Sequence, residues 1–160
     1  MNHIPARRER RVHTQSIAVP IDDVFPLICP VREAAWLEGF DFQMVFSASG
    51  LAEKGAVFLT DSPGEPTTIW TISRHDPVEK IVEFTCITPG SRVRVLEIAL
   101  RPSPSGGTEI TCTADYTVLG PDGEAFLDAF PPEAFQAAMT FMDRSLEHYF
   151  LTGTQLPGGH

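Results

Sequence analysis

The sequence lacks the features of a secreted or membrane-spanning chain. No segment approaches the roughly 20 consecutive apolar residues that a membrane-spanning helix needs. The first thirteen residues carry four arginines against one glutamate, and no apolar run follows them as it would in a signal peptide. We therefore expect no membrane span and interpret residues 1–10 as a flexible basic arm, with contact to an acidic partner as the alternative.

Cysteine is scarce, and the three cysteines form no recognisable pattern. Cys29, Cys86 and Cys112 are far apart, with no CxxC pair and no cysteine–histidine spacing typical of a metal site. Such thiols are typical of small buried side chains in a reducing compartment. We therefore expect a cytoplasmic protein without a bound metal.

An excess of positive charge and the common catalytic motifs are also missing. The 12 lysines and arginines face 21 acidic residues, which gives a formal net charge of −9 and argues against a nucleic-acid partner. No GxSxG, HExxH, phosphate-binding glycine loop or dinucleotide-binding fingerprint is present. The sequence therefore predicts no cofactor, and any chemistry must come from isolated polar groups in an apolar pocket. Whether the protein is an enzyme stays open.

A long amphipathic segment, residues 131–151, closes the chain. Pro131 and Pro132 suit a helix start, Glu133 suits the first turn, and Gly153 is a plausible terminator. Twenty helical residues span about 30 Å, enough to cross a sheet. At about 100° per residue, one face of this helix is apolar: Phe135, Ala138, Met139, Met142, Leu146, Tyr149 and Phe150.

Strand-like segments precede this helix, and they are separated by short turns rich in proline and glycine. The expected strands are residues 11–19, 41–47, 56–61, 67–75, 80–88, 92–101 and 109–119. Two short helices are expected at 21–29 and 31–37, and a helical or irregular approach at 122–130. Short connections favour antiparallel pairing, and the alternation of polar and apolar residues leaves one face of the sheet wet.

We predict an α+β fold in which a curved seven-stranded antiparallel sheet wraps around the long C-terminal helix. Two short helices follow the first strand. The domain is expected to span residues 11–152, and residues 153–160 are interpreted as a flexible tail. One helix cannot fill a strongly curved sheet, so we expect a cavity between the helix and the sheet.

Two segments resemble those of a known superfamily. The opening AVPIDDVFPLICP and the terminal FQAAMTFMDRSLEHYF are similar to the corresponding parts of the helix-grip fold of the START and birch-pollen-allergen superfamily, often labelled SRPBCC. The run CPVREAAW, followed by Gly39 and Phe40, resembles a bacterial subgroup of uncharacterised members. The resemblance covers roughly residues 11–152 and implies the helix-grip fold. The superfamily includes lipid and hormone binders, polyketide cyclases and dehydratases, and chaperone-activating proteins, so the fold does not choose among them.

The inward side chains of the sheet and helix are the candidates for a ligand cavity, although each could equally be ordinary core. They are Trp36, Phe42, Met44, Phe46, Trp70, Phe84, Cys112, Tyr116, Phe135, Met139, Met142, Leu146 and Tyr149. Methionine adapts its shape to a loosely specified ligand. The two tyrosine hydroxyls would need partners if buried and are candidate polar contacts for a ligand.

Glu97, Tyr116 and Arg94 are the candidate catalytic residues. Strict alternation along residues 92–100 would turn Glu97 inward with the valines, where it could act as a general base. A bulge near residues 95–96 would instead turn the leucines and isoleucine of this strand inward and leave Glu97 in solvent, which is our interpretation.

Arg92 and Arg94 share one face of the same segment. We interpret them as solvated, and the alternative is an inward arginine that binds a ligand carboxylate or enolate. Near the expected cavity mouth, Arg32 and Glu33 could meet a polar ligand end, or they could pair with neighbouring structure. Trp36 could cover the entrance or anchor the short helices.

The leading functional hypothesis is the binding of a hydrophobic or aromatic small molecule, of the lipid or polyketide kind, in the cavity. An enzyme of the polyketide cyclase or dehydratase type would hold its substrate in a reactive pose and move protons in the same cavity. A protein-interaction module of the chaperone-activator type would instead have a shallow or filled pocket and an exposed apolar patch. The apolar flank around Phe141 also allows a homodimer.

Overall fold

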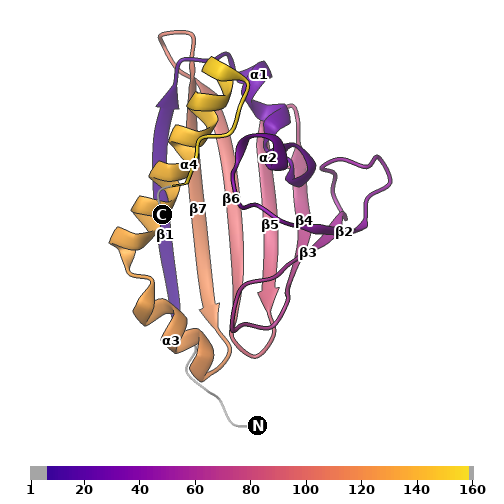
Figure 1. Ribbon diagram of the computed structural model, residues 1–160, viewed down its shortest axis with the longest axis vertical. Coiled ribbons are helices and arrows are strands. Elements are labelled where there is room, and N and C mark those ends of the chain that lie inside the picture. The colour runs from indigo at the N-terminus through magenta and orange to yellow at the C-terminus, as the bar shows by residue number, and fades with distance from the viewer. Residues whose placement is uncertain (1–6, 159–160) are drawn as a thin grey trace.

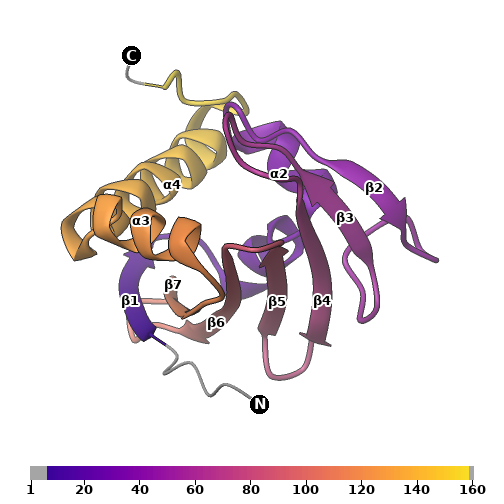
Figure 2. The same cartoon turned by 90° about the horizontal axis from the view of Figure 1, so that it is seen from below.

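The computed structural model describes residues 7–158, which form one seven-stranded antiparallel sheet and a set of helices on its concave side (Figures 1 and 2). The strand order is β1-β7-β6-β5-β4-β3-β2. The strands are β1 (Arg8–Ile17), β2 (Gln43–Phe46), β3 (Val57–Thr60), β4 (Thr68–Asp76), β5 (Ile81–Thr88), β6 (Arg92–Pro102) and β7 (Thr108–Val118). The helices are α1 (Ile21–Val24), η1 (Phe25–Leu27), α2 (Pro30–Trp36), α3 (Pro121–Ala129) and α4 (Pro132–Thr152). The predicted α+β helix-grip architecture is confirmed.

Strand β1 begins earlier than the sequence indicated. Arg8 is already paired with Thr117 of β7, and the Arg10 guanidinium donates to the Asp115 carboxylate at 2.7 Å. Arg7 donates to the Glu124 carboxylate of α3 at 2.6 Å. The interpretation of residues 7–10 as a flexible arm is therefore wrong, because their positive charges meet acidic partners brought close by the fold. Residues 1–6 of that arm lie outside the described part of the chain.

Helix α4 crosses the concave side of the sheet, as Figure 2 shows. It ends at Gly153, which has a φ of 73° and donates its backbone N–H to the Tyr149 carbonyl at 2.7 Å. A left-handed residue is needed at this position, and glycine adopts that conformation without strain. After the helix, the Gln155 side chain donates to the Ala34 carbonyl of α2 at 2.7 Å, so the beginning of the expected tail contacts the short helices.

The polar face of α4 also binds the sheet edge. The His13 ring on β1 lies between Gln136 and Asp143 of α4. Its Nδ1 is 2.6 Å from the Gln136 side-chain oxygen, and its Nε2 is 2.6 Å from an Asp143 carboxylate oxygen. Burial alone would lower the pKa of His13, but the hydrogen bonds with Asp143 and Gln136 raise it above its usual value. Burial raises the pKa of Asp143, which opposes a charged pair. The short contact between His13 and Asp143 joins β1 to α4 at this edge of the sheet.

The two halves of α4 have different surroundings. Leu146 is 2 % exposed and packs into the larger core cluster with Trp36, and Tyr149 packs against the same cluster. Phe135, in the first half of the helix, belongs to a second cluster with Tyr116. Helices α1 and α2 fill the concave side beneath the second half of α4, so open space is confined to the first half.

Helix α3 lies unusually close to one end of the sheet. A Cβ placed on Gly123 would stand 2.1 Å from the Ser91 carbonyl, a separation that no side chain tolerates. Glycine at this position therefore allows α3 to rest against the turn between β5 and β6. Among residues 7–158, no helix is both long and apolar enough to cross a membrane.

Candidate functional site

A cavity of about 310 Å³, here called the main cavity, lies between the first half of α4, helix α2 and strands β3 to β6. This volume is at the lower end of the range for small-molecule sites. It is lined by Glu33, Leu37, Gly39, Phe40, Asp41, Phe58, Thr60, Asp61, Ser62, Trp70, Phe84, Arg94, Leu96, Ile98, Phe135, Met139 and Met142.

An aromatic cluster forms the sheet side of the main cavity. The Phe58 and Trp70 rings are stacked with centroids 5.1 Å apart, and the Phe84 ring meets both of them edge-on. Such mutually packed rings form a rigid wall. The facing side is adaptable, because Met139 and Met142 of α4 are half-buried and unbranched. The main cavity therefore pairs a rigid flat surface with a deformable one.

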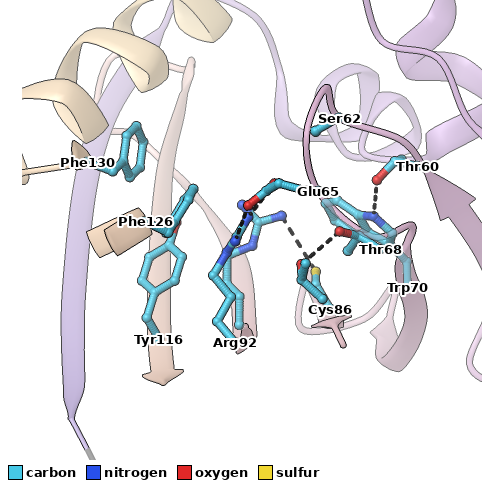
Figure 3. A pocket seen from close by; sticks show the side chains of 12 residues that line it. Thr60, Ser62, Glu65, Thr68, Trp70, Cys86, Arg92, Tyr116, Phe126 and Phe130 are labelled. Carbon is cyan, nitrogen blue, oxygen red and sulfur yellow. Dashed lines mark hydrogen bonds and ion pairs between the residues drawn. The ribbon is translucent and has the colours of Figure 1, made fainter. Parts of the chain in front are cut away.

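A second space of about 280 Å³, here called the polar chamber, adjoins the main cavity at the end of the sheet near α3. The two spaces share Thr60, Ser62, Trp70 and Arg94. The remaining lining of the polar chamber is Glu65, Thr68, Cys86, Thr88, Arg92, Tyr116, Phe126 and Phe130. Figure 3 shows Glu65 reaching across this chamber to Arg92.

Arg92 is fully engaged within the protein. Its two terminal nitrogens donate to the two Glu65 carboxylate oxygens at 2.6 and 3.2 Å, and its guanidinium carbon lies 3.4 Å from the Phe126 ring centroid. The Arg92 hydrogen bond lowers the pKa of Glu65 and outweighs its burial, so the pair is charged at neutral pH. This pair connects the loop after β3 to β6 over the polar chamber.

Arg94 has different partners. Its guanidinium lies over the Trp70 ring, 4.8 Å from the centroid, and one nitrogen donates to the Cys86 sulfur at 3.6 Å. No carboxylate of the described residues lies within ion-pair distance of it, whereas Arg92 has Glu65. Burial lowers the pKa of Arg94, but the neighbouring thiol and the Tyr116 hydroxyl raise it, and the net shift is upward. The cavity therefore holds a permanent positive charge.

The interpretation of Arg92 and Arg94 as a solvated face is wrong. The register between β5 and β6 runs without interruption, so the expected bulge near residues 95–96 is not formed. Arg94 therefore shares its face with the buried Ile98 and Leu100. Glu97 takes the opposite face, paired with Glu83 and Thr113, and has no access to the main cavity. Strand β6 alternates strictly, but the face that carries Ile98 and Leu100 is the inward one. Glu97 therefore points outward without any bulge.

Three carboxyl groups line the main cavity, and Glu33 of α2 is the one whose pKa is clearly shifted. It is 9 % exposed, and burial is the only influence on its pKa, without a hydrogen-bond or charge partner among the side chains of residues 7–158. Burial raises its pKa from the usual 4.5 to about 7, because the apolar surroundings disfavour the charged form. The nearby Cys112 thiol has its pKa raised to about 12, first by burial and then by the charges of Asp143 and Glu33. Glu33 therefore changes its charge close to neutral pH.

The structure divides the other expected cavity residues into three groups. Trp70, Phe84, Phe135, Met139 and Met142 line the main cavity, and Tyr116 lines the polar chamber. A second group packs into the core instead of lining the main cavity, because α1 and α2 fill that part of the concave side: Trp36, Phe42, Met44, Cys112, Leu146 and Tyr149. Within it, the Trp36 ring N–H donates to the Leu27 carbonyl at 3.2 Å and anchors α2.

The third group is Phe46 alone, and the prediction that it lines the cavity is wrong. The pairing of β2 with β3 shifts between Met44 and Phe46, and this irregularity turns Phe46 outward, where it is 58 % exposed. Glu65, Phe58 and Phe126 also line the two spaces and were not predicted from the sequence. Phe126 and Phe130 are four residues apart in a helical segment, and this spacing could have predicted that the two rings lie on the same side of it.

The strongly curved sheet, the long terminal helix and the enclosed cavity define a helix-grip protein of the SRPBCC superfamily. Within it, the chain belongs to the family described as polyketide cyclase/dehydrase and lipid transport, whose model matches residues 9–150. No curated protein matches the sequence at a significant level.

Several solved structures share this fold. Truncated norcoclaurine synthase from Thalictrum flavum is 14% identical with a TM-score of 0.68, and the match covers 95% of this chain and 99% of that one. An uncharacterised protein from Rhizobium leguminosarum is 16% identical with a TM-score of 0.65, covering 92% and 97%. A protein from Rhodobacter sphaeroides is 18% identical with a TM-score of 0.64, covering 92% and 98%. At these identities the likeness shows the fold alone.

Proposed function

We propose that the protein binds a hydrophobic or aromatic small molecule in the main cavity. The observation that carries this proposal is the pairing of the Phe58–Trp70 stack with the facing methionines of α4. Apolar walls with a few polar groups are typical of small-molecule sites. The family description, which names both polyketide cyclases and lipid transport, supports a ligand of this kind. A protein-interaction module is expected to have a shallow or filled pocket, and a cavity of about 310 Å³ with an aromatic wall favours small-molecule binding over that alternative.

Native mass spectrometry with a panel of bicyclic aromatic compounds and fatty acids tests the proposal. Met139→Trp fills the main cavity and is expected to abolish retention of any ligand that the wild-type protein keeps. Thr140→Trp places the same side chain on the exposed face of α4 and is the matched control. Equal retention by both variants would show that the ligand binds elsewhere, and no retention by the wild-type protein would contradict the proposal.

A second candidate function, acid–base catalysis, is favoured by the presence of Glu33 and Arg94 in one cavity. A carboxylate with a pKa of about 7 is suited to remove a proton from a carbon next to a carbonyl group. The Arg94 guanidinium, which lines the same cavity, could stabilise the negative oxygen of the resulting enolate. The proton removed moves to Glu33, and its return to the carbon restores both groups.

Solvent deuterium exchange into the methyl group of 2-acetylnaphthalene, followed by NMR, tests this second function. The wild-type protein is expected to accelerate the exchange, and Glu33→Gln is expected to slow it about 100-fold, the usual size of a general-base contribution. Exchange at the buffer rate with the wild-type protein would count against catalysis of this kind.

A further inference from the structure

The positive charge of Arg94 is not neutralised within residues 7–158, although the other inward arginines are. Arg11, which is 8 % exposed, donates to the Glu9 carboxylate at 2.6 Å, and Arg92 binds Glu65. A charge removed from water is costly unless an opposite charge or several hydrogen bonds compensate it. The neighbours of Arg94 are the Trp70 ring face, the Cys86 sulfur and the Tyr116 hydroxyl, and none of the three is a carboxylate. An anion entering the cavity would supply the compensation that the protein does not.

The surroundings of Arg94 hold its guanidinium in place while leaving donors available. The Trp70 ring covers one face of the group, and Cys86 takes one of its five N–H donors. Thr60 adds a neutral donor at the boundary between the two spaces. Its oxygen already accepts the Trp70 ring N–H at 2.8 Å, so its hydroxyl hydrogen is free to donate. A planar, prepositioned guanidinium of this kind suits a carboxylate, which it can bind through two parallel hydrogen bonds.

The acidic groups beside Arg94 favour a ligand with one negative charge over a ligand with two. One arginine can neutralise one negative charge, and the other charged groups that line the main cavity are acidic: Glu33, Asp41 and Asp61. A phosphate monoester would bring close to two negative charges into this setting and leave one uncompensated. A carboxylate on an apolar body matches both the single cation and the aromatic wall beside it.

We infer that Arg94 binds the carboxylate of an amphipathic ligand whose apolar body occupies the main cavity. This inference rests on the proposed binding function and specifies its ligand class. The carboxylate lies at the junction of the main cavity and the polar chamber, against the edge of the Trp70 stack. The Glu65–Arg92 ion pair stays intact when the ligand binds, and neither of its charged groups pairs with the ligand carboxylate.

Calorimetric titration with two matched probes, 2-naphthylacetate and the neutral 2-naphthylacetamide, tests this inference at pH 7. The wild-type protein is expected to bind the acid about 30-fold or more tightly than the amide, as for a charge pair formed in a desolvated site. Arg94→Met is expected to remove this preference while leaving amide binding in place. Arg94→Lys retains the charge but not the planar fork, and an intermediate preference is expected.

Arg101→Met is the control, because Arg101 lies on the same strand with a side chain that is 75 % exposed and pairs with Glu109. It is expected to keep the full preference for the acid. Equal binding of acid and amide by the wild-type protein would overturn the inference and leave the proposed function standing. A preference that survives in Arg94→Met would also overturn it. Binding of neither probe would overturn both.

Discussion

Replacement of Glu33 by glutamine is expected to stabilise the protein at alkaline pH. The substitution preserves the shape of the side chain and removes a carboxyl group that the fold buries without a partner among the described side chains. Its pKa rises from 4.5 in the unfolded chain to about 7 in the folded protein. At 1.36 kcal/mol for each pKa unit, ionising this group at alkaline pH costs the folded state about 3 kcal/mol.

The sign of the pH dependence follows from proton binding. Between pH 4.5 and about 7 the folded state keeps the Glu33 proton and the unfolded state does not, so stability falls as the pH rises. Well above pH 7 Glu33 is ionised in both states, so this contribution to the unfolding free energy falls no further. Glu33→Gln should therefore exceed the wild-type protein by about 3 kcal/mol at pH 8, and the two should agree within about 0.5 kcal/mol at pH 4.5.

Urea unfolding followed by circular dichroism at several pH values measures these free energies. Because folding also raises the pKa of His13, where burial lowers it but the hydrogen bonds with Asp143 and Gln136 outweigh that effect, the quantity to compare is the difference between wild type and variant at each pH. Glu79→Gln removes an exposed carboxylate from the turn between β4 and β5 and should show no such difference. If Glu33→Gln destabilises the protein equally at every pH, the carboxyl group is hydrated or hydrogen-bonded, and the reasoning fails.

Three further predictions follow from the site. Arg94→Met should raise the unfolding free energy of the ligand-free protein by about 1–4 kcal/mol in urea titrations, because it replaces a partly buried charge without a carboxylate partner among residues 7–158 by an apolar side chain; a loss of stability would contradict this. Glu65→Gln breaks the ion pair with Arg92 and should increase the dissociation rate of a bound probe several-fold in stopped-flow measurements, and an unchanged rate would show that ligand leaves by another route. Phe46→Ser should change stability by less than about 0.5 kcal/mol, whereas Phe84→Ala should cost about 3–5 kcal/mol; similar losses would place Phe46 in the core after all.

The local sequence pattern determined the elements of this fold. Alternation along residues 109–119 predicted a strand that the structure has at Thr108–Val118, and the prolines and glycine around residues 131–153 predicted the limits of α4 within one residue. These signals are local because side-chain alternation and backbone preferences depend on neighbours in the chain. The count of strands, their antiparallel pairing and the closing helix followed from them, whereas the strand order came from the structure.

The tertiary structure alone decided the chemistry of the site. In β6 both alternating sets contain apolar residues, so only the packing of its neighbours determined that Arg94 points inward and Glu97 outward. Glu33 lies on a helix of seven residues, too short for periodicity to identify the face that meets the cavity. The cavity itself exists because α1 and α2 fill only the space under the second half of α4. Burial, charge compensation and cavity shape depend on residues distant in sequence, and no local pattern records those distances.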